Sequence, residues 1–381
     1  MMKNNNGKKL GLYVHIPFCI RKCNYCDFLS FPGNEAVQGQ YVQTLVQEME
    51  GWREKVRSFD VDTVFIGGGT PSILSVSNMD KIFQEIADCF SMPALTEFTI
   101  ECNPGTVTCE KLELYYRAGV NRISIGMQSA TDGELKKLGR IHTYDEFTRC
   151  YEMVRKVGFD NVNIDVMAAI PGQTIQSYED TLQCVLKSEP EHISSYSLII
   201  EEGTPFYEQY ADVPPVDEET DRQMYELTGE VLEKAGYRRY EISNYAKPGK
   251  ECRHNLKYWQ RKQYLGLGLG ASSFMEHNRF ANARDLAEYQ DRVRSGGQAV
   301  YETEHLSETD EKAEFMYLGL RCMQGISVRE FNICFGEELD SCFGEEIRQC
   351  VEQGLLVYEN DRIYLTKRGI DVSNRVFALF I

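Results

Sequence analysis

The sequence predicts an α/β fold, a partial TIM-like (β/α)6 barrel followed by a smaller C-terminal α+β region that resembles a winged helix. From residue 10 to about residue 200, short runs of β-branched and aromatic residues alternate with helical patterns. This alternation is typical of βα units built on a parallel sheet. A length of 381 residues with 42% apolar content also suffices for one large core and smaller additional parts.

Six strands are expected in the barrel. The segments between them show apolar residues three or four positions apart, most clearly over residues 37–56 and again over Tyr178–Lys187, which predicts helices there. The predicted strands are Leu12–Ile16, Thr63–Ile66, Glu97–Glu101, Arg122–Gly126, Asn161–Val166 and Ile193–Ile199.

The βα rhythm stops near Pro214 and Pro215, which precede a cluster of acids and a helix predicted over Arg222–Ala235. The stretch that follows is rich in glycine, asparagine and aromatic residues. We therefore expect three parts: a core at residues 1–212, a barrel-associated segment at 213–300 and a C-terminal domain at 301–381.

The C-terminal domain carries helix, helix, hairpin and helix patterns. Ser327 and Glu330 have the spacing of a capping box. The runs Leu355–Tyr358 and Arg362–Leu365 flank a turn signal at residues 360–361. A winged helix can bind DNA, but from Arg321 onward acidic residues outnumber basic ones, which disfavours contacts with phosphate. We expect this domain to pack or to dock onto a partner protein.

Composition restricts the class of protein further. A formal net charge of −17 makes the molecule repel nucleic-acid backbones, so we expect no nucleic-acid partner. The first nine residues lack an apolar signal region, and no later run approaches the ~20 apolar residues of a membrane span. We therefore expect a cytoplasmic location, where the 13 cysteines are thiols, metal ligands or small core residues.

Three of these cysteines form the most informative motif. Cys19, Cys23 and Cys26 follow the first predicted strand, at the end of a barrel strand where active sites lie. Zinc needs a fourth Cys or His at a recognisable spacing, and the nearest histidine, His15, belongs to the strand itself. Iron–sulfur clusters take cysteine thiolates, and three of them leave one iron open to a further ligand. Three chance core cysteines are the simple alternative.

The spacing Cys-x3-Cys-x2-Cys resembles the defining motif of the radical S-adenosylmethionine (SAM) superfamily. The resemblance implies a partial barrel of the radical SAM type, a [4Fe-4S] cluster on Cys19, Cys23 and Cys26, SAM as a second cofactor, and a flavodoxin or ferredoxin as reductant. Each of the other matching residues also has a simple explanation when it is taken singly. The glycines can form an ordinary turn, Glu101 can be a solvated loop acid, and Arg140 can form an ordinary ion pair. By resemblance, the SAM pocket is formed by Tyr13, Tyr25, Gly68, Gly69, Thr70, Glu101, Gln128, Arg140, Asp165 and Ile199.

Within the superfamily, the motifs from Tyr13 to about Phe274 are similar to the group that contains oxygen-independent coproporphyrinogen III oxidase and the HemW haem chaperones. Phe28 stands where the oxidases have a further cysteine. The first strand begins near residue 10, which leaves no N-terminal extension to cover a substrate. Both features favour the chaperones, and the oxidase remains the alternative, an enzyme that makes protoporphyrinogen IX by radical decarboxylation.

A third feature is the run His254-Asn255-Leu-Lys-Tyr258-Trp259, which resembles a segment tied to haem in the chaperones. A neutral imidazole can ligate haem iron, and aromatic rings pack on the macrocycle. A histidine beside aromatic residues is also often a satisfied core residue, and Cys252 is a second candidate ligand or an idle thiol. The resemblance implies haem or a porphyrin as ligand and a haem-acceptor protein, membrane-bound in some cases, and it leaves a homodimer open.

Two positions depart from the family pattern. Ala169 stands where members often have glycine, and the run from Gly266 to Phe274 lacks the proline and histidine that many members carry. Both departures bear on the detailed haem geometry, and neither touches the cluster motif.

Overall fold

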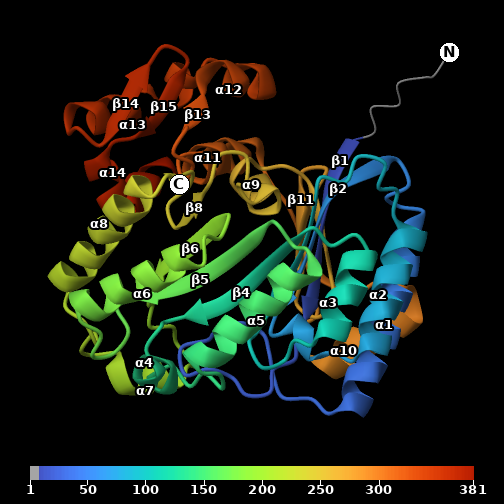
Figure 1. Ribbon diagram of the computed structural model, residues 1–381. Coiled ribbons are helices and arrows are strands. Elements are labelled where there is room, and N and C mark those ends of the chain that lie inside the picture. The colour runs from blue at the N-terminus through green and yellow to red at the C-terminus, as the bar shows by residue number, and fades with distance from the viewer. Residues whose placement is uncertain (1–7) are drawn as a thin grey trace.

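The structure, a computed structural model, describes residues 8–381. Twelve strands form one sheet in the order β12-β11-β10-β9-β1-β2-β3-β4-β5-β6-β8-β7. Strands β1 to β6 are parallel to one another, as a βα barrel requires (Figure 1). All six predicted strands are present with shifted ends, as β1 (Lys8–Ile16), β2 (Phe59–Gly68), β3 (Glu97–Cys102), β4 (Arg122–Gln128), β5 (Val162–Ala168) and β6 (His192–Ser197).

Helices cover the outer face of this sheet, and most of them begin at a polar capping residue. The side chains of Asn34, Thr108 and Thr143 each accept a hydrogen bond from a backbone N–H in the first helical turn, which satisfies a donor that the helix leaves free. Figure 1 shows α1, α2 and α3 side by side on one part of the sheet. The helices are α1 (Glu35–Arg53), α2 (Val76–Cys89), α3 (Cys109–Arg117), α4 (Asp132–Lys137), α5 (Tyr144–Val157), α6 (Ile175–Lys187), α7 (Pro205–Tyr210) and α8 (Glu218–Lys234).

The segment after α8 extends the sheet at both edges, which the sequence pattern did not predict. These strands are short, and one of them contains a glycine where two backbones meet: a Cβ on Gly266 would lie 2.2 Å from the carbonyl oxygen of Ser272. The added elements are β7 (Arg238–Arg239), β8 (Asn244–Ala246), α9 (Arg253–Trp259), β9 (Tyr264–Leu267), β10 (Ser272–Met275), β11 (Asn278–Asn282), α10 (Leu286–Gly296) and β12 (Val300–His305).

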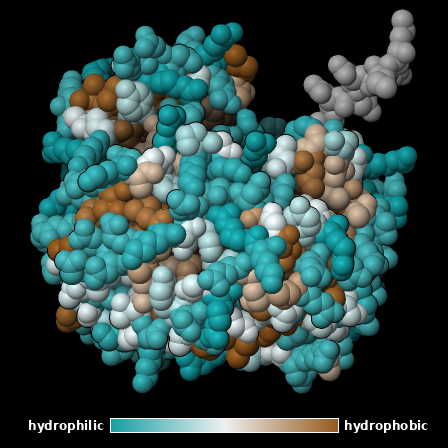
Figure 2. Space-filling view, in the orientation of Figure 1, coloured by the Kyte–Doolittle hydropathy of each residue, from teal (hydrophilic) through white to brown (hydrophobic). Residues whose placement is uncertain are grey.

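The C-terminal region has its own hydrophobic core. Figure 2 shows it as a lobe at the upper left of the surface, with hydrophobic residues exposed on it. A sheet of order β13-β15-β14 packs with the helices. The elements are α11 (Glu308–Gly319), β13 (Ile326–Ser327), α12 (Val328–Phe335), α13 (Leu339–Glu352), β14 (Leu356–Glu359), β15 (Arg362–Leu365), α14 (Lys367–Asp371) and α15 (Ser373–Phe377), followed by a 3-10 turn at Ala378–Phe380.

Two local predictions in this lobe have different outcomes. The hairpin is confirmed, because β14 and β15 pair across a turn in which Asn360 has φ of 54°. The capping box forms only in part. Ser327 Oγ accepts from the N–H of Glu330 at 3.0 Å, but the Glu330 carboxylate pairs with Lys262 at 3.4 Å instead of returning to the cap. The division into three parts stays a prediction. The predicted boundary between residues 300 and 301 falls inside β12, which pairs with β11.

The barrel strands alternate between an apolar outer face and a polar inner face. Outward residues such as Val64, Ile100 and Ile125 join the core beneath the helices. Parallel strands that are buried on both faces are usually apolar throughout, so the polar inner face needs an explanation. Its groups must bond to one another or to a ligand. The buried inner residues are Thr63, Glu97, Thr99, Arg122, Ser124, Asn163, His192 and Ser194.

One row of hydrogen bonds runs through this polar interior. Tyr240 OH lies 2.8 Å from His192 Nε2, and His192 Nδ1 lies 2.6 Å from Asn163 Oδ1. Asn163 Nδ2 donates to Asp165 Oδ1 at 2.7 Å. Burial lowers the pKa of His192, so its ring is neutral and has one donor and one acceptor. Each group in the row therefore donates towards Asp165.

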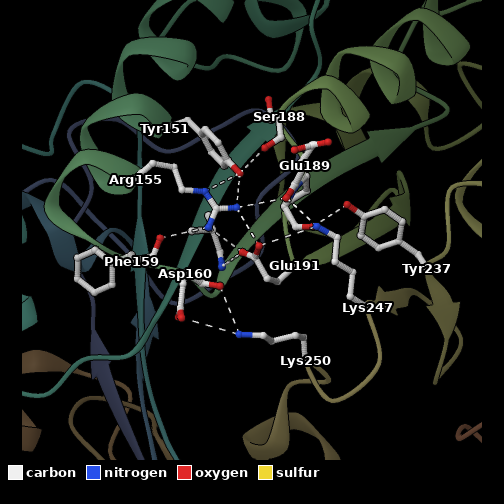
Figure 3. A network of polar contacts seen from close by, with 12 residues as sticks. Tyr151, Arg155, Phe159, Asp160, Ser188, Glu189, Glu191, Tyr237, Lys247 and Lys250 are labelled. Atoms are coloured by element: carbon white, nitrogen blue, oxygen red, sulfur yellow. Dashed lines mark hydrogen bonds and ion pairs between the residues drawn. The ribbon is translucent and has the colours of Figure 1, made fainter.

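A second polar network lies at the start of β5 and β6 (Figure 3). The Glu191 carboxylate accepts from the Arg155 guanidinium at 2.8 Å and from the N–H of Val162 at 2.9 Å. The Arg155 guanidinium also lies over the ring of Tyr151, 5.0 Å from its centre. These contacts join α5 to the first residues of two strands.

Replacing Glu191 by alanine should lower the free energy of unfolding by about 3 kcal/mol, because it removes the carboxylate partner of the Arg155 guanidinium and the acceptor of the Val162 N–H in a mostly buried site. Urea unfolding followed by circular dichroism measures this. The control variant Glu152→Ala removes an exposed carboxylate from α5, the helix that carries Arg155. It should change stability by less than about 0.5 kcal/mol. Equal midpoints for both variants would show that the network contributes nothing.

Candidate functional site

The loop after β1 brings the three predicted cysteine ligands to one pocket. Cys19, Cys23 and Cys26 are free, half-buried thiols, and all three line a pocket at the C-terminal end of the parallel strands. Backbone bonds shape the loop: the N–H of Cys26 donates to the carbonyl of Cys23 at 3.2 Å. Within residues 8–381, no three His, Cys, Asp or Glu side chains converge as ligands of a single metal ion would.

The glycine turn after β2 forms a second wall. The N–H groups of Gly68, Gly69 and Thr70 all donate to acceptors inside the protein, at 2.7–3.1 Å. The turn therefore offers carbonyl oxygens to a ligand, which suits an ammonium group better than a phosphate. A Cβ on Gly69 would lie 2.7 Å from the carbonyl oxygen of Phe18 and 3.0 Å from Cys19 Sγ. Only glycine allows this close approach to the cysteine loop.

Charged groups line the inner wall. Burial, together with the nearby Asp165, raises the pKa of Glu101 to about 8. The Arg140 guanidinium donates to the carbonyl of Gly126 at 2.7 Å and lies 3.8 Å from Cys23 Sγ. The pocket holds about 730 Å³ of space between atoms, part of it open to solvent. A ligand with a carboxylate, a cationic centre and hydroxyl groups finds partners here.

The structure gathers most of the predicted SAM residues at this pocket, but not Tyr13 or Ile199. Tyr13 lies in the barrel interior, where its hydroxyl is 2.9 Å from His15 Nδ1 and its ring packs near Phe65. Ile199 lies beyond the end of β6 with 67% of its surface exposed. The predicted residues that line the pocket are Tyr25, Gly68, Gly69, Thr70, Glu101, Gln128, Arg140 and Asp165.

The lining residues that sequence reasoning did not assign to the site include Asn103, Ser124 and Gly126. Asn103 Oδ1 accepts from the Arg140 guanidinium at 2.5 Å, and a Cβ on Gly126 would lie 2.8 Å from Arg140 Nη2. Ser124 and Gly126 alternate with the apolar residues of β4, so the period of two along the strand carried a signal for them. Nothing in the local sequence marks Asn103 beyond its place after a strand.

His254 lies away from the cysteines, nearer the start of the strands. It is completely buried, and its ring stacks on Phe65 with centroids 5.4 Å apart. Nδ1 shares a hydrogen bond with Thr63 Oγ1 at 2.9 Å, and Nε2 shares one with the Tyr258 hydroxyl at 2.8 Å. Burial lowers the pKa of His254 to about 3. Both ring nitrogens are occupied in this conformation, which favours the satisfied core residue, and the role of His254 as haem ligand stays a prediction.

Cys252 is also engaged in the interior. Its thiol donates to Glu97 Oε1 at 3.4 Å, and the N–H groups of Arg253 and His254 donate to the same carboxylate at 2.7 and 3.1 Å. The carboxylate thus caps the start of α9 from strand β3. This anchor holds α9 against the barrel and leaves Cys252 fully buried.

Comparisons with known proteins identify the family. Residues 13–185 match the radical SAM superfamily, and residues 306–372 match the HemN C-terminal domain. Heme chaperone HemW of Bacillus subtilis (strain 168) is 36% identical over 374 residues, which cover 97% of this chain and 98% of that protein. The chain belongs to the HemW family. HemW of Escherichia coli (strain K12) is 34% identical over 378 residues, 98% of each protein.

A solved structure supports the fold of this HemW family member. Coproporphyrinogen III oxidase (HemN) from Escherichia coli, a radical SAM enzyme, matches with a TM-score of 0.88 over 99% of this chain and 91% of that chain. At 21% identity the match shows the fold alone. The predicted radical SAM fold is confirmed. Between residues 8 and 381, no helix has the length and apolar character needed to cross a membrane.

The structural role of His254 can be tested directly. His254→Ala should lower the free energy of unfolding by about 3 kcal/mol, because it opens a cavity and leaves the Thr63 and Tyr258 hydroxyls without their partner. Arg253→Ala removes a neighbouring exposed side chain and keeps the backbone bond to Glu97, so it should be close to neutral. Thermal unfolding measures both, and unchanged stability of His254→Ala would contradict the structural role.

Proposed function

We propose that this protein is a haem chaperone, which binds haem and passes it to haem-requiring acceptor proteins. The observation that carries the proposal is the similarity of nearly the whole chain to relatives named heme chaperone HemW. As part of the same proposal, Cys19, Cys23 and Cys26 hold a [4Fe-4S] cluster and the pocket beside them holds SAM.

The donor groups fit these two cofactors. Three soft thiols on one wall suit an iron–sulfur cluster with one iron left for another ligand. When bound, the cluster supplies one-electron chemistry towards SAM. The carbonyl oxygens of the glycine turn would accept from the SAM ammonium group, and the Arg140 guanidinium would pair with its carboxylate. Glu101 and Asp165 would accept hydrogen bonds from the ribose hydroxyls.

The oxidase activity is the second candidate, and the fold match to coproporphyrinogen III oxidase supports it. Phe28 favours the chaperone. It lines the mouth of the cysteine pocket with 63% of its surface exposed, in the place where the oxidases are expected to carry a further cysteine. The partners that follow from the chaperone function are haem, an acceptor protein and a small reductant such as flavodoxin or ferredoxin, and the proposed location is the cytoplasm.

Titration of the cluster-loaded protein with haem under anaerobic conditions tests the function. We expect a shift of the haem Soret band that saturates with one haem per chain, and no protoporphyrinogen when coproporphyrinogen III, SAM and a reductant are supplied. An unshifted Soret band would contradict the chaperone function. Formation of protoporphyrinogen in proportion to SAM consumed would establish the oxidase instead.

The close approach of the glycine turn predicts a selective defect. Gly69→Ala should abolish cluster loading, because the added methyl group would collide with the cysteine loop. Iron and sulfide content after anaerobic reconstitution measures the loss. Gly39→Ala adds a methyl group to α1 where nothing lies within 4 Å, so it should load normally and be stabilised by up to about 1 kcal/mol. Normal loading of Gly69→Ala would contradict the proposed site.

The raised pKa of Glu101 predicts a pH dependence of SAM binding. With a pKa of about 8, the carboxyl is mostly protonated at pH 7 and becomes a carboxylate as the pH rises. The carboxylate attracts the cationic ligand, so this group should raise SAM affinity up to about tenfold between pH 7 and pH 9. Isothermal titration calorimetry measures the affinity.

Glu101→Gln serves as the comparison for this experiment. Its side chain cannot ionise, so any remaining change of affinity with pH belongs to SAM or to other groups. Affinities of wild type and Glu101→Gln that follow the same pH curve would contradict the assignment.

A further inference from the structure

A second cavity lies between α9, α11 and the C-terminal sheet. It shares no lining residue with the cysteine pocket and is larger, with about 1160 Å³ of space between atoms against about 730 Å³, each partly open to solvent. The cysteine pocket is lined by charged groups and is already assigned to the cluster and SAM. The lining of the second cavity mixes polar and charged residues with five aromatic and aliphatic ones, Tyr240, Leu256, Trp259, Phe315 and Ile326.

Two lining residues, Trp259 and Cys322, and Arg321 beside Trp259 carry polar groups that the protein leaves unused. The indole N–H of Trp259 is buried without a hydrogen-bond partner, and so is Nε of Arg321, whose guanidinium stacks 4.4 Å from the Trp259 ring. Cys322 is a nearly buried free thiol. It is the only His or Cys among the residues that line the cavity. Unpaired buried donors in a native protein call for a ligand, an ion or a water molecule.

The rim carries charge for an acidic ligand. Lys262 pairs with Glu330 at 3.4 Å, and Arg261 pairs with Glu314 at 3.1 Å. Arg362 also lines the cavity, and it forms no ion pair with any residue between 8 and 381. Glu251 is the remaining acid of the lining. Arg362 is thus the cation best placed to accept a carboxylate from outside.

We propose that this cavity is the haem seat, with the macrocycle against Trp259 and Phe315, the iron facing Cys322 and a propionate at Arg362. The proposal rests on the haem-binding function proposed above. Flat aromatic ligands pack on aromatic walls, and a cysteine sulfur is an established haem ligand. Burial raises the pKa of the Cys322 thiol to about 12, and a coordinating metal cation deprotonates a thiol outright, so the proton passes to solvent water at the open side of the cavity as the iron–sulfur bond forms.

Haem titration of the cluster-loaded full chain tests the seat with three variants. Gln260→Trp places a bulky side chain at an exposed position of the rim and should weaken haem binding at least tenfold. Arg362→Glu should weaken it about tenfold by repelling the propionate. Cys322→Ser should move the Soret maximum of the ferric complex. Arg348→Glu makes the same charge change on α13, at a position outside the cavity lining, and should bind as wild type.

The outcomes separate the seat from the function. If wild type shows no Soret shift, the chaperone function fails and the seat fails with it. If wild type binds haem and Gln260→Trp and Arg362→Glu bind equally well, the function stands and the seat is overturned. Loss of binding in Phe28→Glu alone, at the mouth of the cysteine pocket, would place haem at that pocket and also overturn the seat. An unchanged Soret maximum in Cys322→Ser would overturn the iron ligand.

Discussion

The hydrogen bonds inside the barrel are the constraint on which the rest of the structure depends. A parallel sheet with helices outside buries both faces, and buried polar groups are tolerated only when they are paired. In this protein the row from Tyr240 through His192 and Asn163 to Asp165 provides that pairing. Asp165 belongs to the cysteine pocket and Tyr240 to the second cavity. The floor of one site and the wall of the other are thus positioned by the same buried bonds.

This arrangement explains where the side chains of residues 254–259 point. Residues four apart on a helix share a face, so His254 and Tyr258 both point into the barrel, where they bond to each other. Trp259 lies on an adjacent face and lines the second cavity. One short helix therefore fills the barrel interior with one face and supplies an aromatic wall with another. Its position is fixed from strand β3 by the Glu97 carboxylate.

Much of the core and of the candidate site could be predicted from the sequence. Runs of β-branched residues predict the six parallel strands. The cysteine, glycine and acidic residues of the pocket follow the ends of these strands in chain order. Arg122, Ser124 and Gly126 also alternate with isoleucines in the sequence. This alternation indicates that one face of the strand is polar. Strand position could not show that Ile199 stays exposed or that Tyr13 lies below the pocket.

The rest depended on contacts between distant residues. Strands β7 to β12 are short, and their pairing depends on edges left by strands far away in the sequence. The role of His254 depended on Thr63 and Phe65, nearly 200 positions earlier, so its residue type alone could not distinguish ligand from core. The second cavity lies between two separately packed cores, and no local pattern reports such a space.

The central claim is that the three thiols hold a cluster against which SAM lies in the same pocket. Electron paramagnetic resonance of the anaerobically reconstituted and reduced protein, recorded with and without SAM, tests it most directly. We predict a cluster signal whose g values change when SAM is added, and no such signal from Cys23→Ala. Identical spectra with and without SAM would contradict the account.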